Sequence, residues 1–464
     1  MMLFVALIAG VGAPIEPETP IDLETAIERA RAVAADVVIA KEDVVLVDAD
    51  YMAALSVILP RVDLAASAGE IFGGEGTLES RERGFRTTAI PGEPIDVDNI
   101  VGSIGPFRDF RVGAYSNPSF GLQFQITQLV FDGGRWWTQL ARVGDVESAR
   151  RAALDRILAE LRVSVAQAFY AHEAARQGKE VVAAQVSSDE RQIERARALL
   201  DAGRAKASDV AAAARNLALD KSELARKQLQ LRQAARRMNF LIGRPVNSPL
   251  VLIVPAGIEA RTGTVTLPLL PPIDDLLTTA RQSRPELVQL EAERAAAEKA
   301  VIIAEADYYP SVSLGANYRK QSRRPDRTFG DPTEGYTAGI DLTVRWNIFE
   351  GRATTARVGQ AESALRKIDA RRDELQRSVD GEVQDVLDQL TLQVELVRLA
   401  HDATGAADEA LRLARGLYDE GRGTLLEVRD AELQVLQARL SGITARLDVE
   451  IAREQLARVL GTHP

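Results

Sequence analysis

Residues 120–134 read FGLQFQITQLVFDGG, and the prediction of the fold starts from them. Apolar and polar side chains alternate as far as Thr127, which predicts a strand with one apolar and one polar face. No proline follows until Pro245, so the Phe-Asp-Gly-Gly ending introduces a very long helical stretch. Residues 336–352 read YTAGIDLTVRWNIFEGR and repeat the order, with the strand first and a proline-free stretch after it.

The two copies keep the same spacing along their length. Several pairs of residues are each 218 positions apart, as in 349 − 131 = 218. They are Phe131 and Phe349, Gly133 and Gly351, Gly203 and Gly421, Asp209 and Glu427, Val210 and Val428, and Gly243 and Gly461. One long period used twice indicates a duplicated half-molecule and not a solenoid. We predict a signal-like segment at residues 1–20, a first repeat at 21–243, a proline-rich linker at 244–272 and a second repeat at 273–464.

The composition argues against several classes of site. A net charge of −10 argues against a nucleic-acid partner, which would need a basic face. Cysteine is absent, which excludes disulfides and thiolate metal ligands. The histidines His172, His401 and His463 have no metal-ligand spacing, and the glycines of residues 73–76 lack the Lys-Ser/Thr of a phosphate loop. We therefore predict no enzyme, no cofactor and no metal.

The first 13 residues form an apolar run of the length of a signal-peptide core. The basic residues that usually precede such a core are missing. The run predicts export, and a buried N-terminal segment is the alternative. No other segment is apolar for long enough to cross a bilayer as a helix, so a membrane crossing would need strands.

The proline-free stretches predict helices of unusual length. Residues 134–200 would form a helix about 100 Å long at ~1.5 Å per residue. In the stretch that returns from it, apolar residues recur at every seventh position, which indicates left-handed coiled-coil packing. These residues are Val210, Leu217, Leu224, Leu231 and Met238. In the second repeat the return helix carries two apolar seams, one with Leu447 and one with Val449, so we expect neighbours on two of its sides.

Four amphipathic strands are predicted, two in each repeat. They lie near residues 61–67, 120–127, 312–318 and 336–348, and residues 68–118 are interpreted as a long loop. Strands of about 9–11 residues cross an outer membrane when tilted, but four strands cannot close a barrel. Closure would need two, three or four copies of the chain. The alternative from the same pattern is a soluble pair of hairpins whose polar side faces water.

These segments follow one another in the same order in both repeats. This arrangement resembles the TolC-like outer-membrane efflux proteins over nearly all of residues 21–464. The resemblance implies an α+β membrane protein. Its homotrimer would form a twelve-stranded β-barrel with four strands from each chain, continued by a periplasmic tunnel of long antiparallel coiled-coil α-helices. The implied location is the outer membrane of a Gram-negative-type bacterium, with most of the chain in the periplasm. The implied function is a passive export conduit of a tripartite efflux or type I secretion system. A soluble periplasmic coiled-coil scaffold or adaptor protein is the alternative.

The resemblance also implies the partners of the chain. The turns between long helices would contact a periplasmic adaptor (membrane fusion) protein, which links the channel to an inner-membrane transporter of the RND, ABC or MFS type. Outer-membrane lipid would surround the strands. The residues implied at the adaptor contact are Leu200, Gly203, Arg204 and Ala205 in the first repeat, and Leu417, Gly421, Leu425 and Leu426 in the second.

The same resemblance implies a gate at the closed end of the tunnel. In the family a tyrosine, an aspartate and an arginine link neighbouring coiled coils, and Tyr418 and Asp209 fall on matching positions. The arginine position is occupied by Gly423, with Arg422 beside it. An acidic pair lining the constriction is matched by Glu427 and Asp430, which lie three apart on one helix face. Threefold symmetry would make this pair a ring of six carboxylates that attracts cations.

Overall fold

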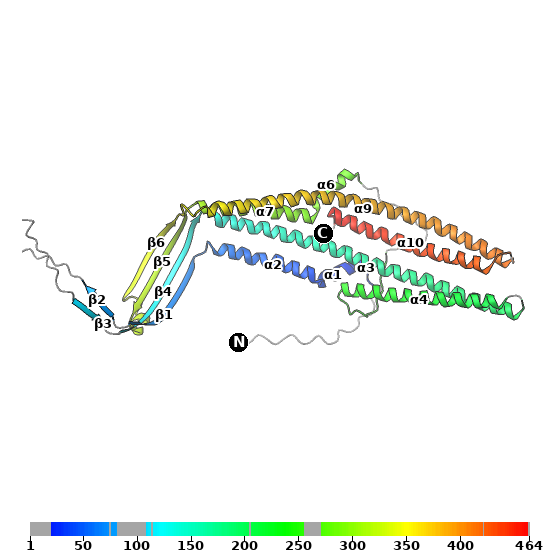
Figure 1. The fold of residues 1–464 in the computed structure, drawn as a ribbon, viewed down its shortest axis with the longest axis horizontal. Helices are drawn as coiled ribbons and strands as arrows, with labels where there is room; N and C mark the ends of the chain where they lie inside the picture. Colours follow the sequence, from blue (N-terminus) through cyan, green and yellow to red (C-terminus); the bar gives the residue numbers. More distant parts are fainter. Residues whose placement is uncertain are drawn as a thin grey trace, which may run out of the picture. The chain divides into compact units, whose positions relative to one another are not determined.

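The computed structural model describes residues 20–73, 76–80, 108–112, 115–203, 206–254, 271–420 and 422–462. Residues 1–19 of the predicted signal-like segment lie outside this set, and so do Arg204, Ala205 and Gly421. The described chain forms two compact units (Figure 1). The helical unit takes its residues from Met1–Tyr51, Gln139–Val301 and Arg357–Pro464, and the sheet unit from Met52–Thr138 and Ile302–Ala356.

Two pairs of long helices dominate the helical unit (Figure 1). In the first pair α3 (Arg135–Asp201) is followed by α4 (Ala207–Leu241), and in the second α9 (Ala353–Asp419) is followed by α10 (Leu425–Leu460). Helices α3 and α9 each contain 67 residues, so each is about 100 Å long. The predicted long helices and their return helices are confirmed.

Shorter helices precede each hairpin. They are α1 (Leu23–Val33) and α2 (Ala35–Ser56) in the first half, and α6 (Ile273–Ser283), α7 (Pro285–Glu305) and the 3-10 turn η2 (Ala306–Tyr308) in the second. These segments are displaced by 250 positions (273 − 23 = 250), whereas the segments after the hairpins are displaced by 218. The first hairpin is therefore the longer by 32 residues (250 − 218 = 32).

Two apolar cores hold the helical unit together, and α10 contributes to both. Ile443 and Leu447 of α10 pack with Phe169 of α3, Met238 of α4 and residues of α1. Val449 lies in a second core with α6 and α9. The prediction that this return helix has neighbours on two sides is confirmed, because its two seams are buried against different helices.

The sheet unit contains four antiparallel strands in the order β1-β4-β5-β6. They are β1 (Arg61–Gly73), β4 (Tyr115–Asp132), β5 (Ser311–Ser322) and β6 (Tyr336–Arg345). The four predicted strands are present, and pairing of β4 with β5 joins the two hairpins. A short helix, α8 (Pro325–Phe329), lies between β5 and β6.

The interpretation of residues 68–118 as a loop is wrong at both of its ends. Strand β1 continues to Gly73, and β4 already begins at Tyr115. A further pair of strands, β2 (Gly76–Ser80) and β3 (Arg108–Val112), follows inside the same segment. Small and polar residues in these strands interrupt the alternation of apolar and polar side chains. The strands pair nonetheless, because ladder hydrogen bonds join backbone groups and do not require alternating side chains.

Candidate functional site

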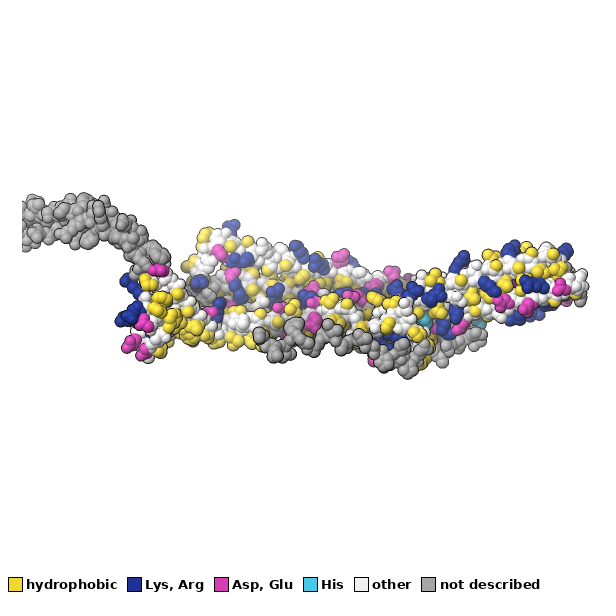
Figure 2. Space-filling view, turned by 90° about the horizontal axis from the view of Figure 1, so that it is seen from below, with side chains coloured by type: hydrophobic (Ala, Val, Ile, Leu, Met, Phe, Trp, Pro, Cys, Tyr) yellow, Lys and Arg dark blue, Asp and Glu magenta, His cyan; other side chains and the backbone are white. Residues whose placement is uncertain are grey.

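The strand register places apolar side chains on one face of the sheet. Leu64, Phe124, Tyr318 and Ala338 lie side by side across the four strands. The next row on this face is formed by Val62, Ile126, Ala316 and Ile340. In the single chain this face is uncovered, since Leu64 is 70% exposed and Ile340 is 81% exposed. Figure 2 shows hydrophobic side chains gathered there. An apolar surface of this kind marks a contact with lipid or with another protein.

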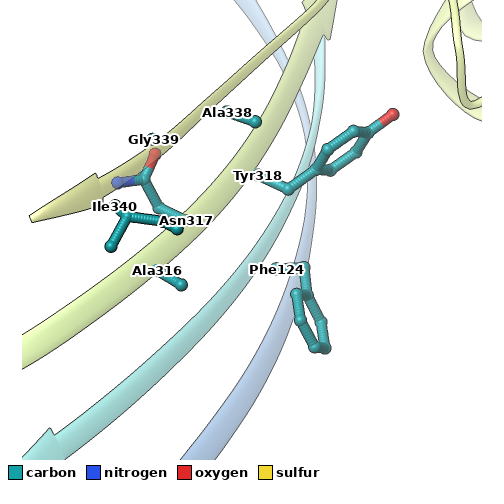
Figure 3. Close-up of a pocket in the computed structure, with 7 residues that line it drawn as sticks. All are labelled: Phe124, Ala316, Asn317, Tyr318, Ala338, Gly339 and Ile340. Carbon is teal, nitrogen blue, oxygen red and sulfur yellow. The ribbon is translucent and has the colours of Figure 1, made fainter.

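A shallow hollow of about 570 Å³ lies on the sheet. Figure 3 shows the rings of Phe124 and Tyr318 beside the small side chains of Ala316 and Ala338. Tyr318 also stacks on Tyr336, with ring centroids 5.4 Å apart. The hollow arises because two alanines stand next to large aromatic rings. Asn317 is the one amide side chain among its lining residues, so the hollow lacks the several convergent polar groups that orient a small-molecule substrate.

The opposite face of the sheet is polar. Arg319 Nη2 donates to Gln123 Oε1 at 3.2 Å, and Gln123 Nε2 donates to Gln125 Oε1 at 3.2 Å. Two residues farther along β5, Gln321 Nε2 donates to Ser119 Oγ at 3.0 Å. These side chains satisfy one another across β4 and β5. The sheet therefore has one face suited to an apolar medium and one suited to water, as the alternation predicted.

Both outer edges of the sheet lack a partner strand within the described residues. Strand β1 pairs only with β4, and β6 pairs only with β5. Every residue of β6 is exposed in the single chain. Open backbone groups are not tolerated in lipid, so these two edges require pairing with another strand.

The first helical tip lies between α3 and α4. Gly203 adopts a left-handed conformation, with φ of 70°, and its backbone N–H donates to the carbonyl of Leu200 at 2.8 Å. A side chain at position 203 would meet no atom within 4 Å, so only the positive φ requires glycine. Leu200 is half-buried, and the predicted contact residues Arg204 and Ala205 lie outside the described residues.

The second tip, between α9 and α10, is more tightly closed. The carbonyl of Leu417 accepts hydrogen bonds from the backbone N–H groups of Arg422 and Gly423, both at 2.9 Å. A Cβ atom at position 423 would lie 3.1 Å from the backbone nitrogen of Tyr418 and 3.2 Å from Leu417 Cβ. A side chain at this position, where the resemblance led us to expect arginine, would therefore require the neighbouring backbone to shift by a few tenths of an ångström. Arg422 is exposed and pairs with Glu420 at 3.8 Å.

Two predicted gate residues cap helices. Glu427 Oε2 accepts from the backbone N–H of Thr424 at 2.8 Å, and Thr424 Oγ1 accepts from the backbone N–H of Glu427 at 3.3 Å. This reciprocal pair is a capping box. At the matching position of the first repeat, Asp209 Oδ2 accepts from the backbone N–H of Lys206 at 3.3 Å. The shared register of Asp209 and Glu427 therefore reflects a shared capping role.

The structure does not bring the predicted gate residues together within one chain. Within the described part of the chain, no hydrogen bond joins Tyr418 to Asp209, and Tyr418 is half-buried beside its own turn. Asp430 is exposed on α10. Of the predicted adaptor-contact leucines, Leu417 is 43% exposed, Leu426 is 64% exposed and Leu425 is half-buried.

A family model described as "Outer membrane efflux protein" matches residues 26–244 and 276–462. The chain belongs to the outer membrane efflux protein family. The predictions of the family, of the fold class of helical tunnel and barrel strands, and of an outer-membrane location are confirmed. The efflux protein is a passive outer-membrane conduit whose helices form a periplasmic tunnel, so the soluble scaffold is not supported.

Solved structures share the fold of the efflux protein at low sequence identity. CusC has a TM-score of 0.76 and 18% identity, covering 96% of this chain and 93% of its own. VceC from Vibrio cholerae has a TM-score of 0.71 and 18% identity, covering 95% and 96%. MtrE from Neisseria gonorrhoeae has a TM-score of 0.72 and 18% identity, covering 95% and 88%. No curated protein sequence matches the chain.

Within the described ranges, none of the helices has the length and apolar content that a membrane span requires. The same ranges contain no group of three or more His, Asp or Glu side chains arranged as metal ligands. The features that bear on function are thus the two-faced sheet, the two helical tips and one buried group of charges.

This buried group of charges, which sequence reasoning missed, joins the two long-helix pairs of the efflux protein. Arg429 of α10 forms a bidentate pair with Asp220 of α4, with Nη1–Oδ2 and Nη2–Oδ1 distances of 2.9 and 2.6 Å. Arg429 Nη1 also lies 3.6 Å from Asp189 Oδ2 of α3 and 3.9 Å from Glu432 Oε2. Glu432 Oε1 accepts from Arg415 Nη2 of α9 at 2.9 Å. We call these five residues the charge cluster.

The charge cluster perturbs the two aspartates in opposite directions. Burial, together with a hydrogen bond to Asp220 and the charge of Asp220, raises the pKa of Asp189 to about 7. Burial acts in the same direction on Asp220, but hydrogen bonds from Arg429 and Asp189 outweigh it and lower the pKa of Asp220. No sequence signal marked these residues, because isolated acids at helical positions are usually solvated. Only the packing of three helices reveals them.

Proposed function

We propose that three copies of the chain close one channel, with β6 of each copy paired to β1 of the next in a twelve-stranded barrel. The two-faced sheet carries this proposal, because its apolar face is uncovered and both of its edges lack a partner among the described strands. Family members act as trimers. Pairing between copies would satisfy the edge backbone groups and place the apolar face against outer-membrane lipid.

Cysteine cross-linking tests the proposed edge pairing. The natural chain contains no cysteine, so introduced pairs report without background. Cysteines scanned along positions 62, 64 and 66 of β1, each combined with a cysteine at 340 or 342 of β6, should give covalent dimers and trimers. A control pair at Ile126 and Ala316, which face each other within one sheet, should give only cross-links within a chain. If no β1–β6 combination links two copies while the control pair reacts, the barrel is refuted.

We also propose that the channel receives cargo from an adaptor and an inner-membrane transporter. Members of the family act with a periplasmic adaptor and an inner-membrane pump. In this proposal the adaptor (membrane fusion) protein contacts the two tips, and the pump is of the RND, ABC or MFS type. The exposed apolar side chains of Leu417 and Leu426 support the tips as the contact, since singly exposed leucines at a turn offer area for burial.

Substitution of the tip leucines tests the adaptor contact. Leu426→Ser should lower export-dependent resistance and adaptor cross-linking while leaving trimer yield unchanged. Leu219→Ser is the matched control, because Leu219 is a similarly exposed leucine on α4 at 58% exposure and lies away from the turn. Equal effects of the two substitutions would argue against the tip as the contact.

We further propose that Asp209, Tyr418, Arg422, Glu427 and Asp430 surround the constriction when three copies assemble. MtrE is described in an open state, so a channel of this fold can open. Three copies of Glu427 and Asp430 would form a ring of six carboxylates that binds multivalent cations. Because Glu427 also caps α10, its charge and its cap must be tested separately.

Planar-bilayer recordings with hexamminecobalt(III) as the blocking cation separate the two roles of Glu427. Glu427→Gln keeps a side-chain oxygen for the cap and removes the charge, so the Glu427→Gln/Asp430→Asn double variant should weaken the block strongly. Glu409→Gln is the control, because Glu409 is an exposed acid on α9 paired with Arg412. Unchanged block in the double variant contradicts the carboxylate ring.

A further inference from the structure

The charge cluster is a largely buried junction between the two long-helix pairs, and its residues lie about one to four helical turns from the helix ends at the tips. Asp189 is 2% exposed, Asp220 5%, Arg429 8% and Glu432 4%. Removing charges from water to this extent is strongly unfavourable, so such a group persists only where its partners are well placed. The contacts of Arg429 with α3 and α4 therefore fix the position of α10 against both helices.

The charges of the cluster do not balance when all groups are ionised. Asp189, Asp220 and Glu432 provide three negative charges, whereas Arg429 and Arg415 provide two positive charges. One carboxylate is in excess at a buried site. A single added proton removes the excess.

The geometry identifies Asp189 as the carboxyl that takes this proton. Its Oδ1 accepts from Gln185 Nε2 at 2.9 Å, but its Oδ2 is buried and accepts no hydrogen bond. The nearest guanidinium nitrogen, Arg429 Nη1, lies 3.6 Å from Oδ2, which is long for a hydrogen bond. Arg429 instead directs its two best hydrogen bonds to Asp220. A protonated Oδ2 can donate to Asp220 and complete the cluster.

We propose that Asp189, Asp220 and Arg429 are positioning residues that hold α10 against α3 and α4, and that proton uptake at Asp189 tightens this junction. Loss of the proton leaves an uncompensated buried carboxylate, which favours separation of α10 from the α3–α4 pair. The two pairs of coiled coils near the tips are then more tightly packed in acid than at neutral to alkaline pH.

The direction of the pH effect follows from linkage. The packed arrangement binds the proton of Asp189 more tightly than a separated arrangement, in which the carboxyl is solvated and titrates near its ordinary pKa of about 4. Packing is therefore fully favoured below about pH 4 and is weakened as the pH rises to about 7, where the raised pKa of Asp189 lies. One proton changes the ratio of the two arrangements by at most about tenfold per pH unit within this window.

The groups that face Asp189 come from every helix packed against it. Asp220 faces it from α4 and Arg429 faces it from α10, with Glu432 3.9 Å from the same Nη1 atom of Arg429. Arg415 of α9 acts through Glu432. Beside the cluster, Lys221 and Glu190 form an exposed ion pair at 2.9 Å, which water screens.

Hydrogen exchange of the assembled full-length channel tests the proposal without adaptor, pump or cargo. The readout is the protection of amides in residues 425–440 of α10, corrected for the intrinsic pH dependence of exchange. Wild-type protection should fall as the pH is raised from about 5 to about 8. Asp189→Asn mimics the protonated carboxyl, because its Nδ2 can donate to Asp220, so its protection should stay high across the range.

Glu190→Gln is the matched control, since it neutralises an exposed acid next to Asp189 and should keep the wild-type response. If Asp189→Asn fails to assemble, Glu432→Gln provides a second variant, because it removes the excess charge and should shift the transition to lower pH. The proposal is overturned if Asp189→Asn keeps the wild-type pH dependence, if Glu190→Gln abolishes it, or if Glu432→Gln leaves it unchanged. Because this readout does not measure export, its failure is distinguishable from failure of the proposed partners.

Discussion

Replacement of Arg429 by methionine should loosen α10 far more than replacement of any exposed arginine on the same helix. Methionine keeps most of the side-chain length but removes the two hydrogen bonds to Asp220, which are 2.9 and 2.6 Å long. Three buried carboxylates then face only Arg415, which is itself half-exposed. Removal of one partner from a buried ion pair costs about 3–5 kcal/mol.

The matched control is Arg439→Met, on the same helix. Arg439 Nη2 lies 2.8 Å from Asp408 Oδ1, but both side chains are about half-exposed. Water screens such a pair, so we expect a cost of about 0–1 kcal/mol. The two arginines have similar contact distances to a carboxylate and differ mainly in burial. Their comparison therefore isolates the effect of burial.

Native-state hydrogen exchange of α10 amides provides the assay, because it measures local opening in a large assembly that does not unfold in two states. At about 1.4 kcal/mol per factor of ten, Arg429→Met should accelerate exchange by between about a hundredfold and a few thousandfold. Arg439→Met should accelerate it by less than about fivefold. If both variants exchange at similar rates, the charge cluster does not hold α10, and the reasoning from burial fails.

Two further comparisons test the packing of the helical unit. Phe169→Ala removes a fully buried ring from the core shared by α1, α3, α4 and α10. It should lower the free energy of unfolding, measured with denaturant or heat, by about 3–5 kcal/mol. Phe240→Ala, at a site that is 73% exposed, should lower it little. Gly461→Ala should be strongly destabilising, because φ is 67° and the new Cβ would lie 2.5 Å from the carbonyl oxygen of Ser283. Gly203→Ala has nearly the same φ but open space around it, so its cost should stay near about 1 kcal/mol; equal losses at the two glycines would contradict the steric argument.

The periodic parts of the fold were predictable from local sequence. In residues 207–241 the absence of proline and the heptad spacing of apolar residues involve only positions close together in the chain. They predicted a long helix, and the structure confirms it. The alternation of apolar and polar residues in 336–345 likewise predicted β6 and its two faces. The additional length of β1 and β4 was not predictable, because their outer parts are specified by backbone pairing between distant segments.

The tips show the limit of motif matching. The displacement of 218 residues identified Asp209 and Glu427 as equivalent positions. The structure shows that both side chains accept capping hydrogen bonds, Asp209 at the start of α4 and Glu427 at the start of α10. The sequence marked Gly423 as a departure from the arginine that the resemblance implied, but the close approach of Leu417 and Tyr418 to this glycine is visible only in the folded chain. Spacing along the chain shows which positions are equivalent, whereas the role of each residue depends on the atoms that pack against it in the folded protein.

The sequence by itself determined the long helices, the two-faced strands and the family, and it predicted the duplication, because each of these depends on the spacing of residues along the chain. Only the tertiary structure decided that α10 lies between two cores and that Asp189, Asp220 and Arg429 meet. These residues are 31 and 209 positions apart (220 − 189 = 31; 429 − 220 = 209). Their energies depend on burial, and burial is a property of the folded chain that no local pattern contains.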